Sequence, residues 1–238
     1  MSQLTQAFFE KILAAEGGYQ NQSADHGNYN RCGINAGTKF GITPSAWQDY
    51  SGQQCPGPET MKSLSKAQAF DFMDWWGRRW RIWEIYDQEL AELVFNAFYG
   101  NPSAAAKALQ QTLSRRGYDL TVDGIMGSRT LAAVNVEVAK DRPALYNAYR
   151  SSWLSYLLSL GNASYTAGWT NRMNRYFPPL PEAPATETPA PNYQVELWQR
   201  RVSGMFKSSD DAIWVWTALA LLFGLIALMY YRLKSIAP

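Results

Sequence analysis

The sequence has very few of the residues on which metal sites and disulfide scaffolds depend. Its 238 residues include one histidine, His26, and two cysteines, Cys32 and Cys55. A zinc hydrolase normally takes at least two of its ligands from histidine, so this composition nearly excludes a zinc amidase or peptidase. Two cysteines are too few for a disulfide scaffold. We therefore expect no metal and no other cofactor.

An excess of charge of either sign is also lacking. The chain has 22 basic and 20 acidic residues, which gives a formal net charge of +2. No long basic run alternates with aromatic residues, so we expect no nucleic-acid partner. Residues 1–15 contain neither the basic segment nor the continuous apolar segment of a signal peptide, and we expect no export by this route.

Proline and uncharged residues concentrate in the last quarter of the chain. Residues 178–191 read PPLPEAPATETPAP, which favours extended backbone and predicts a semi-rigid linker over residues 178–192. Residues 213–231 form an uncharged run of 19 residues with aromatic residues at both ends, long enough for a helix to span a bilayer. We therefore predict a juxtamembrane segment and a transmembrane helix within residues 193–238, with a lipid bilayer as partner.

Helical patterns dominate the rest of the chain. Phe8, Ile12 and Leu13 recur at the spacing of one helix face, and Ser65 opens a capping box at the start of another helix. Only residues 28–42 contain candidate extended segments. The sequence therefore predicts an all-α fold with at most a small β-hairpin, a helical C-terminal module, a Pro-rich linker and one C-terminal transmembrane helix.

Two carboxylates lie in contrasting surroundings. Glu16 follows Phe8 and Ile12 on the apolar face of its helix, and it lies in the last turn, where the helix dipole is negative. Both effects disfavour the ionised form and predict a raised pKa, which a general acid needs near neutral pH. Asp25 lies in a polar segment that keeps a carboxylate ionised. Glycoside hydrolysis uses such a pair; the structural alternatives are a solvent-facing helix end and a loop cap.

Three motifs resemble the signature of glycoside hydrolase family 108. They are EGGY at residues 16–19, Asp25, and GTKFGIT at residues 37–43. Members of this family are N-acetylmuramidases found in phages, prophages and secretion loci. The resemblance implies a lysozyme-like muramidase domain over residues 1–100.

The resemblance also implies roles for individual residues. The Glu-x8-Asp spacing of Glu16 and Asp25, followed by Thr38, is similar to the acid, carboxylate and threonine set of phage-type lysozymes; the segment between Asp25 and Thr38 is longer than in the shorter family members. By this likeness Glu16 is the catalytic acid, and Asp25 and Thr38 position the attacking water. Tyr19 and Gly41, which belong to the same motifs, are implied substrate contacts.

Two later segments extend the likeness within the same domain. Trp75 and Trp76 resemble an aromatic pair that follows the second long helix of the family, and Asn96 resembles a buried asparagine of a later helix. All three are therefore further candidates for substrate binding.

The likeness continues in a peptidoglycan-binding helical module, predicted over residues 101–177. It centres on the run YDLTVDGIMGSRT at residues 118–130. Asp123 and Gly124 make a tight turn there, where exposed backbone amides receive sugar or peptide oxygens. The alternative is a purely structural turn.

The two cysteines leave a choice open. Cys32 and Cys55 flank the loop that carries Thr38. In an oxidising compartment they form a disulfide, and otherwise they remain two free thiols.

The sequence therefore predicts a peptidoglycan hydrolase that cleaves the β-1,4 bond between N-acetylmuramic acid and N-acetylglucosamine. Its role is local cell-wall degradation or host lysis by a phage or virion, with virion or lysis-complex proteins as further partners. The predicted location is a bacterial inner membrane or a viral membrane, with the catalytic domain acting on the periplasmic wall. Two alternatives remain: a non-catalytic membrane-anchored wall-binding or virion structural protein, and an endopeptidase with Cys32 as nucleophile and His26 as base.

Overall fold

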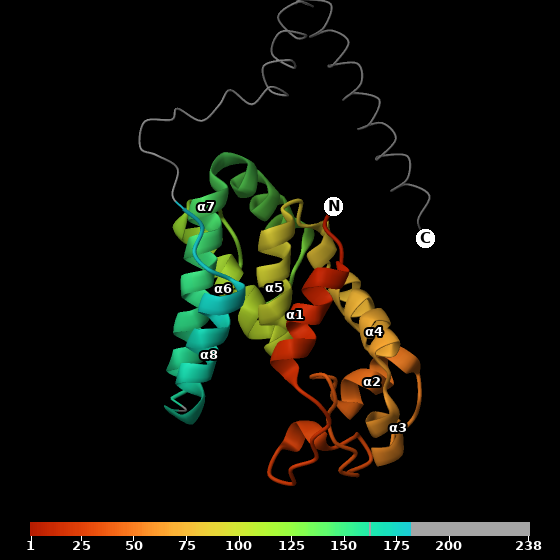
Figure 1. Ribbon diagram of the computed structural model, residues 1–238. Coiled ribbons are helices and arrows are strands. Elements are labelled where there is room, and N and C mark those ends of the chain that lie inside the picture. Colours follow the sequence, from red (N-terminus) through yellow and green to blue (C-terminus); the bar gives the residue numbers. More distant parts are fainter. Residues whose placement is uncertain (162, 182–238) are drawn as a thin grey trace, which may run out of the picture. The chain divides into compact units, whose positions relative to one another are not determined.

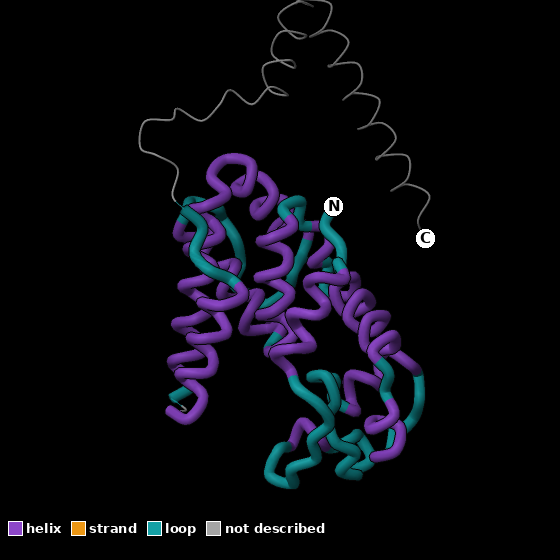
Figure 2. Tube along the Cα trace, in the orientation of Figure 1, coloured by secondary structure: helices purple, strands orange, loops and turns teal. Residues whose placement is uncertain are grey.

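Helices make up the regular structure of the described residues, which are 1–161 and 163–181 of the computed structural model. No β-strand occurs within these ranges, and Figure 2 shows helices and loops only. The predicted α-helical class is confirmed for this part of the chain. Its α-helices are α1 (Gln6–Glu16), α2 (Pro44–Ser51), α3 (Pro58–Ser63), α4 (Lys66–Arg79), α5 (Gln88–Gly100), α6 (Pro102–Arg115), α7 (Ser128–Ser159) and α8 (Ala163–Tyr176), and its 3₁₀ helices are η1 (His26–Asn28) and η2 (Ile82–Glu84).

Side-chain caps explain where several helices begin. Thr5 accepts a hydrogen bond from the amide of Phe8 at the start of α1. Ser65 forms the predicted capping box with Gln68 at the start of α4. Asp87 caps α5 by accepting from a backbone amide at 2.8 Å. Each cap satisfies an amide that the helix itself leaves without a partner.

α5 lies at the centre of the hydrophobic core. Its buried Phe95 packs edge-on against Phe8 of α1, with ring centroids 5.6 Å apart, and stacks on Trp83 of η2 at 5.2 Å. α5 also packs against α6 and α7, and α8 packs against α7 (Figure 1). Residues Met1–Ala183 form one compact unit as a result.

A kink in α7 and a set of polar contacts fix the position of α8. Asp141 departs from helical geometry, with φ −156° and ψ 77°, and Pro143 follows it inside the helix. Beyond the kink, Arg150 donates to the carbonyl oxygen of Phe177 and to the side chain of Asn174, both at 2.6 Å. These contacts hold the end of α8 against α7.

Three predictions about the division of the chain stay predictions. No helix of residues 1–161 and 163–181 is both long and apolar enough to cross a bilayer. The predicted linker beyond residue 181 and the predicted transmembrane helix at residues 213–231 lie outside the described residues. The predicted boundary between residues 100 and 101 falls at the junction of α5 and α6.

Candidate active site

Glu16 ends α1, and its two carboxylate oxygens have different surroundings. Oε1 accepts a hydrogen bond from Nη2 of Arg172 in α8 at 2.7 Å. Oε2 faces Gly41, because a Cβ placed on that glycine would lie 2.7 Å from this oxygen. Within the described part of the chain, no donor contacts Oε2. The Glu16 side chain is 21% exposed, so one oxygen is held while the other remains available to a ligand.

Arg172 adds a positive charge to the surroundings expected for Glu16. The sequence predicted an apolar helix face at the negative end of a helix dipole. The structure places a guanidinium in direct contact with the carboxylate as well. The sequence carried no signal for this partner, since 156 positions separate the two residues.

The loop that faces Glu16 adopts left-handed backbone conformations. Phe40 has φ +55° and Gly41 has φ +75°. Tyr99 of α5 donates to the carbonyl oxygen of Phe40 at 2.9 Å, and its ring would lie 2.6 Å from a Cβ on Gly41. Desolvation, and then the negative charge of Glu16, raise the pKa of Tyr99 well above its ordinary value. Its hydroxyl therefore stays protonated and holds the loop against α5.

Asp25 and Thr38 are connected through Gln20, a residue with no distinguishing signal in the sequence. Asp25 caps η1 through Oδ1, which accepts from the Gly27 amide, and its Oδ2 accepts from the Gln20 side chain, both at 2.9 Å. The Gln20 backbone pairs with Thr38 in both directions, at 2.8 and 2.9 Å. Thr38 Oγ1 is buried without a hydrogen-bond partner among the described residues. The hydrogen-bonding capacity of this hydroxyl is therefore unused among the described residues.

Aromatic residues of α4 pack next to Tyr99. Trp76 lies 6.4 Å from Tyr99 and stacks on Phe72 at 5.8 Å, measured between ring centroids. Trp75 lies 5.4 Å from Tyr50. Both tryptophans are partly exposed, and Trp76 Nε1 has no hydrogen-bond partner in the part of the chain that the structure describes. Trp76 is thus connected to the Glu16 site through Tyr99, and substrate binding by either tryptophan stays a prediction.

Other predicted residues shape the loop itself. Tyr19 donates to the carbonyl oxygen of Ala36 at 3.2 Å and covers Gly37 so closely that a side chain there would overlap its ring. Cys32 and Cys55 form a disulfide with their Cα atoms 5.8 Å apart. Of the two alternatives for the cysteines, the structure therefore has the disulfide, and Cys32 is not a free nucleophile.

Asn96 lies beside α8. Its side-chain nitrogen is 4.0 Å from the sulfur of Met173, the neighbour of Arg172. The side-chain oxygen of Asn96 is buried with no partner among residues 1–161 and 163–181. Asn96 therefore contacts the helix that supplies Arg172, and a direct contact with substrate stays a prediction.

Asp123 and Gly124 form the predicted tight turn, and Gln110 of α6 holds it. Asp123 Oδ1 accepts from the Gln110 side chain and from the Ile125 amide, both at 2.8 Å. These hydrogen bonds, led by that of Gln110, lower the pKa of Asp123. The Gly124 amide donates to Gln110 Oε1 at 2.9 Å. The Gly124 amide therefore already has a hydrogen-bond partner within the protein. This favours the alternative reading, in which the turn is purely structural.

The sequence matches two families along most of the described residues. The family described as "Glycosyl hydrolase 108" matches residues 9–122, and the one described as "Predicted Peptidoglycan domain" matches residues 104–174. No curated protein matches the sequence. Among solved structures, the chain is similar to that described as "Structure of Brucella abortus SagA", with a TM-score of 0.56 and 24% identity, covering 72% of this chain and 92% of that one. At this identity the likeness shows a shared fold.

The first match contains Glu16, Asp25, Thr38, Trp75 and Trp76, and the second contains most of α6, all of α7, and Arg172. Residues 9–122 therefore belong to glycosyl hydrolase family 108, and with its peptidoglycan domain the chain is a glycoside hydrolase that acts on peptidoglycan.

Proposed function

We propose that this enzyme is an N-acetylmuramidase, which cleaves the β-1,4 bond between N-acetylmuramic acid and N-acetylglucosamine. Glu16 is the general acid, and its Oε2 carries the proton to the glycosidic oxygen. The observation that carries the proposal is the asymmetry of this carboxylate. Arg172 holds Oε1, whereas Oε2 faces the Gly41 loop with no donor among the described residues.

Asp25 and Thr38 are proposed to position the attacking water. The unpaired, buried hydroxyl of Thr38 supports this role, because such a group costs free energy unless it finds a partner. Asp25 is exposed and bonded to Gln20, which pairs with Thr38. Gln20 thus joins the two water-positioning groups into one unit.

The contact with Arg172 at 2.7 Å orients Glu16 through Oε1 and leaves Oε2 directed at Gly41. Arg172 is then a positioning residue, and it contacts no reacting atom.

The two alternative functions, an endopeptidase and a wall-binding protein, differ in the support that they have. An endopeptidase with Cys32 as nucleophile lacks support, because Cys32 is bonded to Cys55. A wall-binding protein without turnover would keep the same fold and the same binding groups, so only an activity measurement separates it from the muramidase.

We also propose that residues 213–231 anchor the enzyme in a bacterial inner membrane or a viral membrane, for local wall degradation or for lysis of a host by a phage or virion. The support is the uncharged run of 19 residues in the sequence. The full chain should sediment with membranes in a high-speed spin without detergent. Recovery in the supernatant would contradict the anchor.

The decisive experiment replaces Glu16 by Gln in the full chain, purified in mild detergent. Glu16→Gln keeps the shape of the side chain but cannot donate a carboxyl proton, so release of reducing ends from peptidoglycan should fall by about 10² to 10⁴. Glu10→Gln, on the exposed side of the same helix, is the matched control and should retain activity. Asp25→Asn and Thr38→Val should lose less. Undiminished activity of a folded Glu16→Gln protein would refute the proposal, and new amino ends in place of reducing ends would indicate a peptidase.

A further inference from the structure

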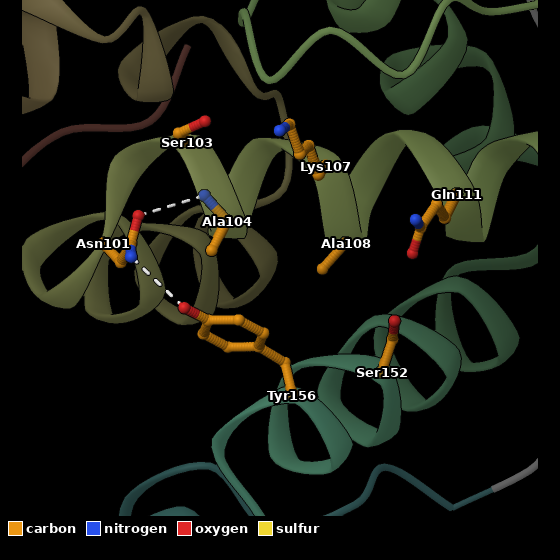
Figure 3. Close-up of a pocket in the computed structure, with 8 residues that line it drawn as sticks. All are labelled: Asn101, Ser103, Ala104, Lys107, Ala108, Gln111, Ser152 and Tyr156. Carbon is orange, nitrogen blue, oxygen red and sulfur yellow. Dashed lines mark hydrogen bonds between the residues drawn. The ribbon is translucent and has the colours of Figure 1, made fainter. Parts of the chain in front are cut away.

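A cavity lies between α6 and α7, largely in the part of the chain that matches the peptidoglycan domain. Its volume is about 410 Å³, which is within the usual range for small-ligand sites, roughly 300–1,000 Å³. Figure 3 shows polar side chains of both helices around it. None of its lining residues belongs to the Glu16 site. The polar residues of its wall are Asn101, Ser103, Lys107, Gln111, Ser152 and Tyr156.

The cavity exists because α6 presents small residues to it. Ala104 and Ala108, one turn apart, face the space between the helices (Figure 3). The turn at Gly124 supports two of the lining residues of α6, since a Cβ on Gly124 would lie 2.7 Å from Ser103 Oγ and 3.2 Å from Lys107 Cε. The turn therefore fixes the stem of Lys107.

Tyr156 is held as a flat aromatic surface. Its ring stacks on Trp153, with centroids 5.0 Å apart and planes at 25°. Its hydroxyl accepts a hydrogen bond from Asn101 Nδ2 at 3.2 Å, while Asn101 Oδ1 caps α6 by accepting from the Ala104 amide at 3.1 Å (Figure 3). The hydroxyl's own proton has no acceptor among the described residues. Tyr156 can therefore donate to a ligand without rearranging.

Lys107 supplies the only charge among the lining residues, and it is positive. No carboxylate of residues 1–161 or 163–181 forms an ion pair with it. Asp123, which precedes the Gly124 that contacts the Lys107 stem, is already bonded to Gln110. A cation with hydroxyl and amide neighbours and no acid suits a ligand that carries a carboxylate among neutral polar groups.

We propose that this cavity is a peptidoglycan-binding site, in which a carboxylate of the polymer binds the Lys107 ammonium and an N-acetyl sugar lies against Tyr156. The inference rests on the proposed function in taking peptidoglycan as the ligand. The carboxylate comes either from the stem peptide or from the lactyl group of a muramic acid that has lost its peptide. Such a site holds the polymer at a second point while Glu16 acts on the glycan.

Binding is tested with the full chain in detergent, in a Glu16→Gln background that prevents turnover. Co-sedimentation with insoluble peptidoglycan gives the apparent Kd. Lys107→Ala should raise it about tenfold, or about 1.4 kcal/mol, because the variant loses a charge-assisted hydrogen bond to the carboxylate. Lys140→Ala is the matched control, since Lys140 lies on α7 with its side chain 69% exposed, and its Kd should stay within about twofold of the parent.

Two further polymers identify the group that is bound. Chitin has the sugar backbone without carboxylates, so Lys107→Ala and the parent should bind it equally. On amidase-treated glycan, a retained effect of Lys107→Ala assigns the lactyl carboxylate, and a lost effect assigns the stem peptide. An unchanged Kd on peptidoglycan, or an equal loss on chitin, would overturn the proposal. If wild-type enzyme releases no reducing ends while the Lys107 effect persists, only the muramidase proposal fails.

Discussion

The loop after α1 and the turn between α6 and α7 both contain motifs that the sequence singled out. They differ in how many of their polar groups have hydrogen-bond partners. In the loop, Thr38 Oγ1 is buried without a partner among the described residues, and Glu16 Oε2 has no donor there. In the turn, the Gln110 side chain bonds Asp123 and the Gly124 amide. In these two segments, unused hydrogen-bonding capacity lies in the region proposed for chemistry, and the hydrogen bonds of Gln110 lie in the turn that joins α6 and α7.

The same contrast applies to buried charge. Glu137 of α7 is fully buried, and it is bonded to Arg116 and to the hydroxyl of Tyr118 at 2.8 Å. Desolvation and this contact raise the pKa of Tyr118, so the hydroxyl remains a donor. Glu16 has one strong partner and is partly exposed. We therefore expect Glu137, whose two oxygens both have hydrogen-bond partners, to stabilise the fold, and Glu16, with one free oxygen among the described residues, to react.

The largest effect should come from the fully bonded carboxylate. Glu137→Ala leaves Arg116 without its buried partner, so we expect a loss of about 3–5 kcal/mol in the free energy of unfolding. Asp119→Ala, an exposed acid in the same module, should change it by less than about 0.5 kcal/mol. Urea denaturation gives both values. Equal stability of the two variants would contradict the view that the hydrogen-bonded Glu137 stabilises the fold.

A side chain at Gly41 should damage the Glu16 site more than it damages the fold. The Cβ of Gly41→Ala would meet Glu16 Oε2 and the Tyr99 ring at 2.7 and 2.6 Å. Displacing the carboxylate by about 1 Å should lower kcat by roughly a hundredfold, or about 2.7 kcal/mol.

Gly52→Ala is the control for Gly41→Ala. Gly52 has φ +74°, but a Cβ at this position would have no atom within 4 Å, so it shares the left-handed strain without the overlap. Its activity should match that of the parent. Similar losses in the two variants would mean that backbone strain, and not the contact with Glu16, explains the result.

Removal of the guanidinium should have a smaller effect on the same carboxylate. Arg172→Gln should lower kcat about tenfold, or about 1.4 kcal/mol, with little change in KM, because the residue orients Glu16 and does not bind substrate. Arg175→Gln, one turn along α8 and without a carboxylate partner in the described ranges, should behave as the parent. A change confined to KM would make Arg172 a substrate-binding residue instead.

The smallest effect concerns alkaline pH and the helical module. Burial raises the pKa of Tyr146 to about 12 and also raises that of Tyr149. An unfolded tyrosine ionises near pH 10, roughly, so this stability is complete below that pH and is lost as the pH rises towards the folded values. Tyr149→Phe should weaken the fall in stability above about pH 10. The exposed Tyr86→Phe should not, as checked by circular dichroism.

Local signals in the sequence predicted the helices well and the site in part. Phe8, Ile12 and Leu13 are buried as their spacing implied, and Glu16 ends that helix as expected. The motif pointed to Gly41. This position needs glycine because Glu16 and Tyr99 approach it closely, and that approach depends on the tertiary structure.

Partners supplied from distant positions were beyond the reach of sequence patterns. Gln110 reaches Asp123 from the preceding helix, and Gln20 connects Asp25 with Thr38. Neither glutamine has a spacing or a neighbour that distinguishes it from an exposed polar residue. These contacts depend on how helices and loops pack, and packing has no local signature.

The ion pair between Glu16 and Arg172 has a consequence for biosynthesis. The two residues are 156 positions apart, and a ribosome adding about 5–20 residues per second needs roughly 8 to 30 s to translate that segment. Throughout this interval the nascent chain carries Glu16 without the residue that orients it. The enzyme therefore acquires its oriented acid only after nearly the whole peptidoglycan domain has been translated, which ties the onset of activity to completion of the part that binds the wall.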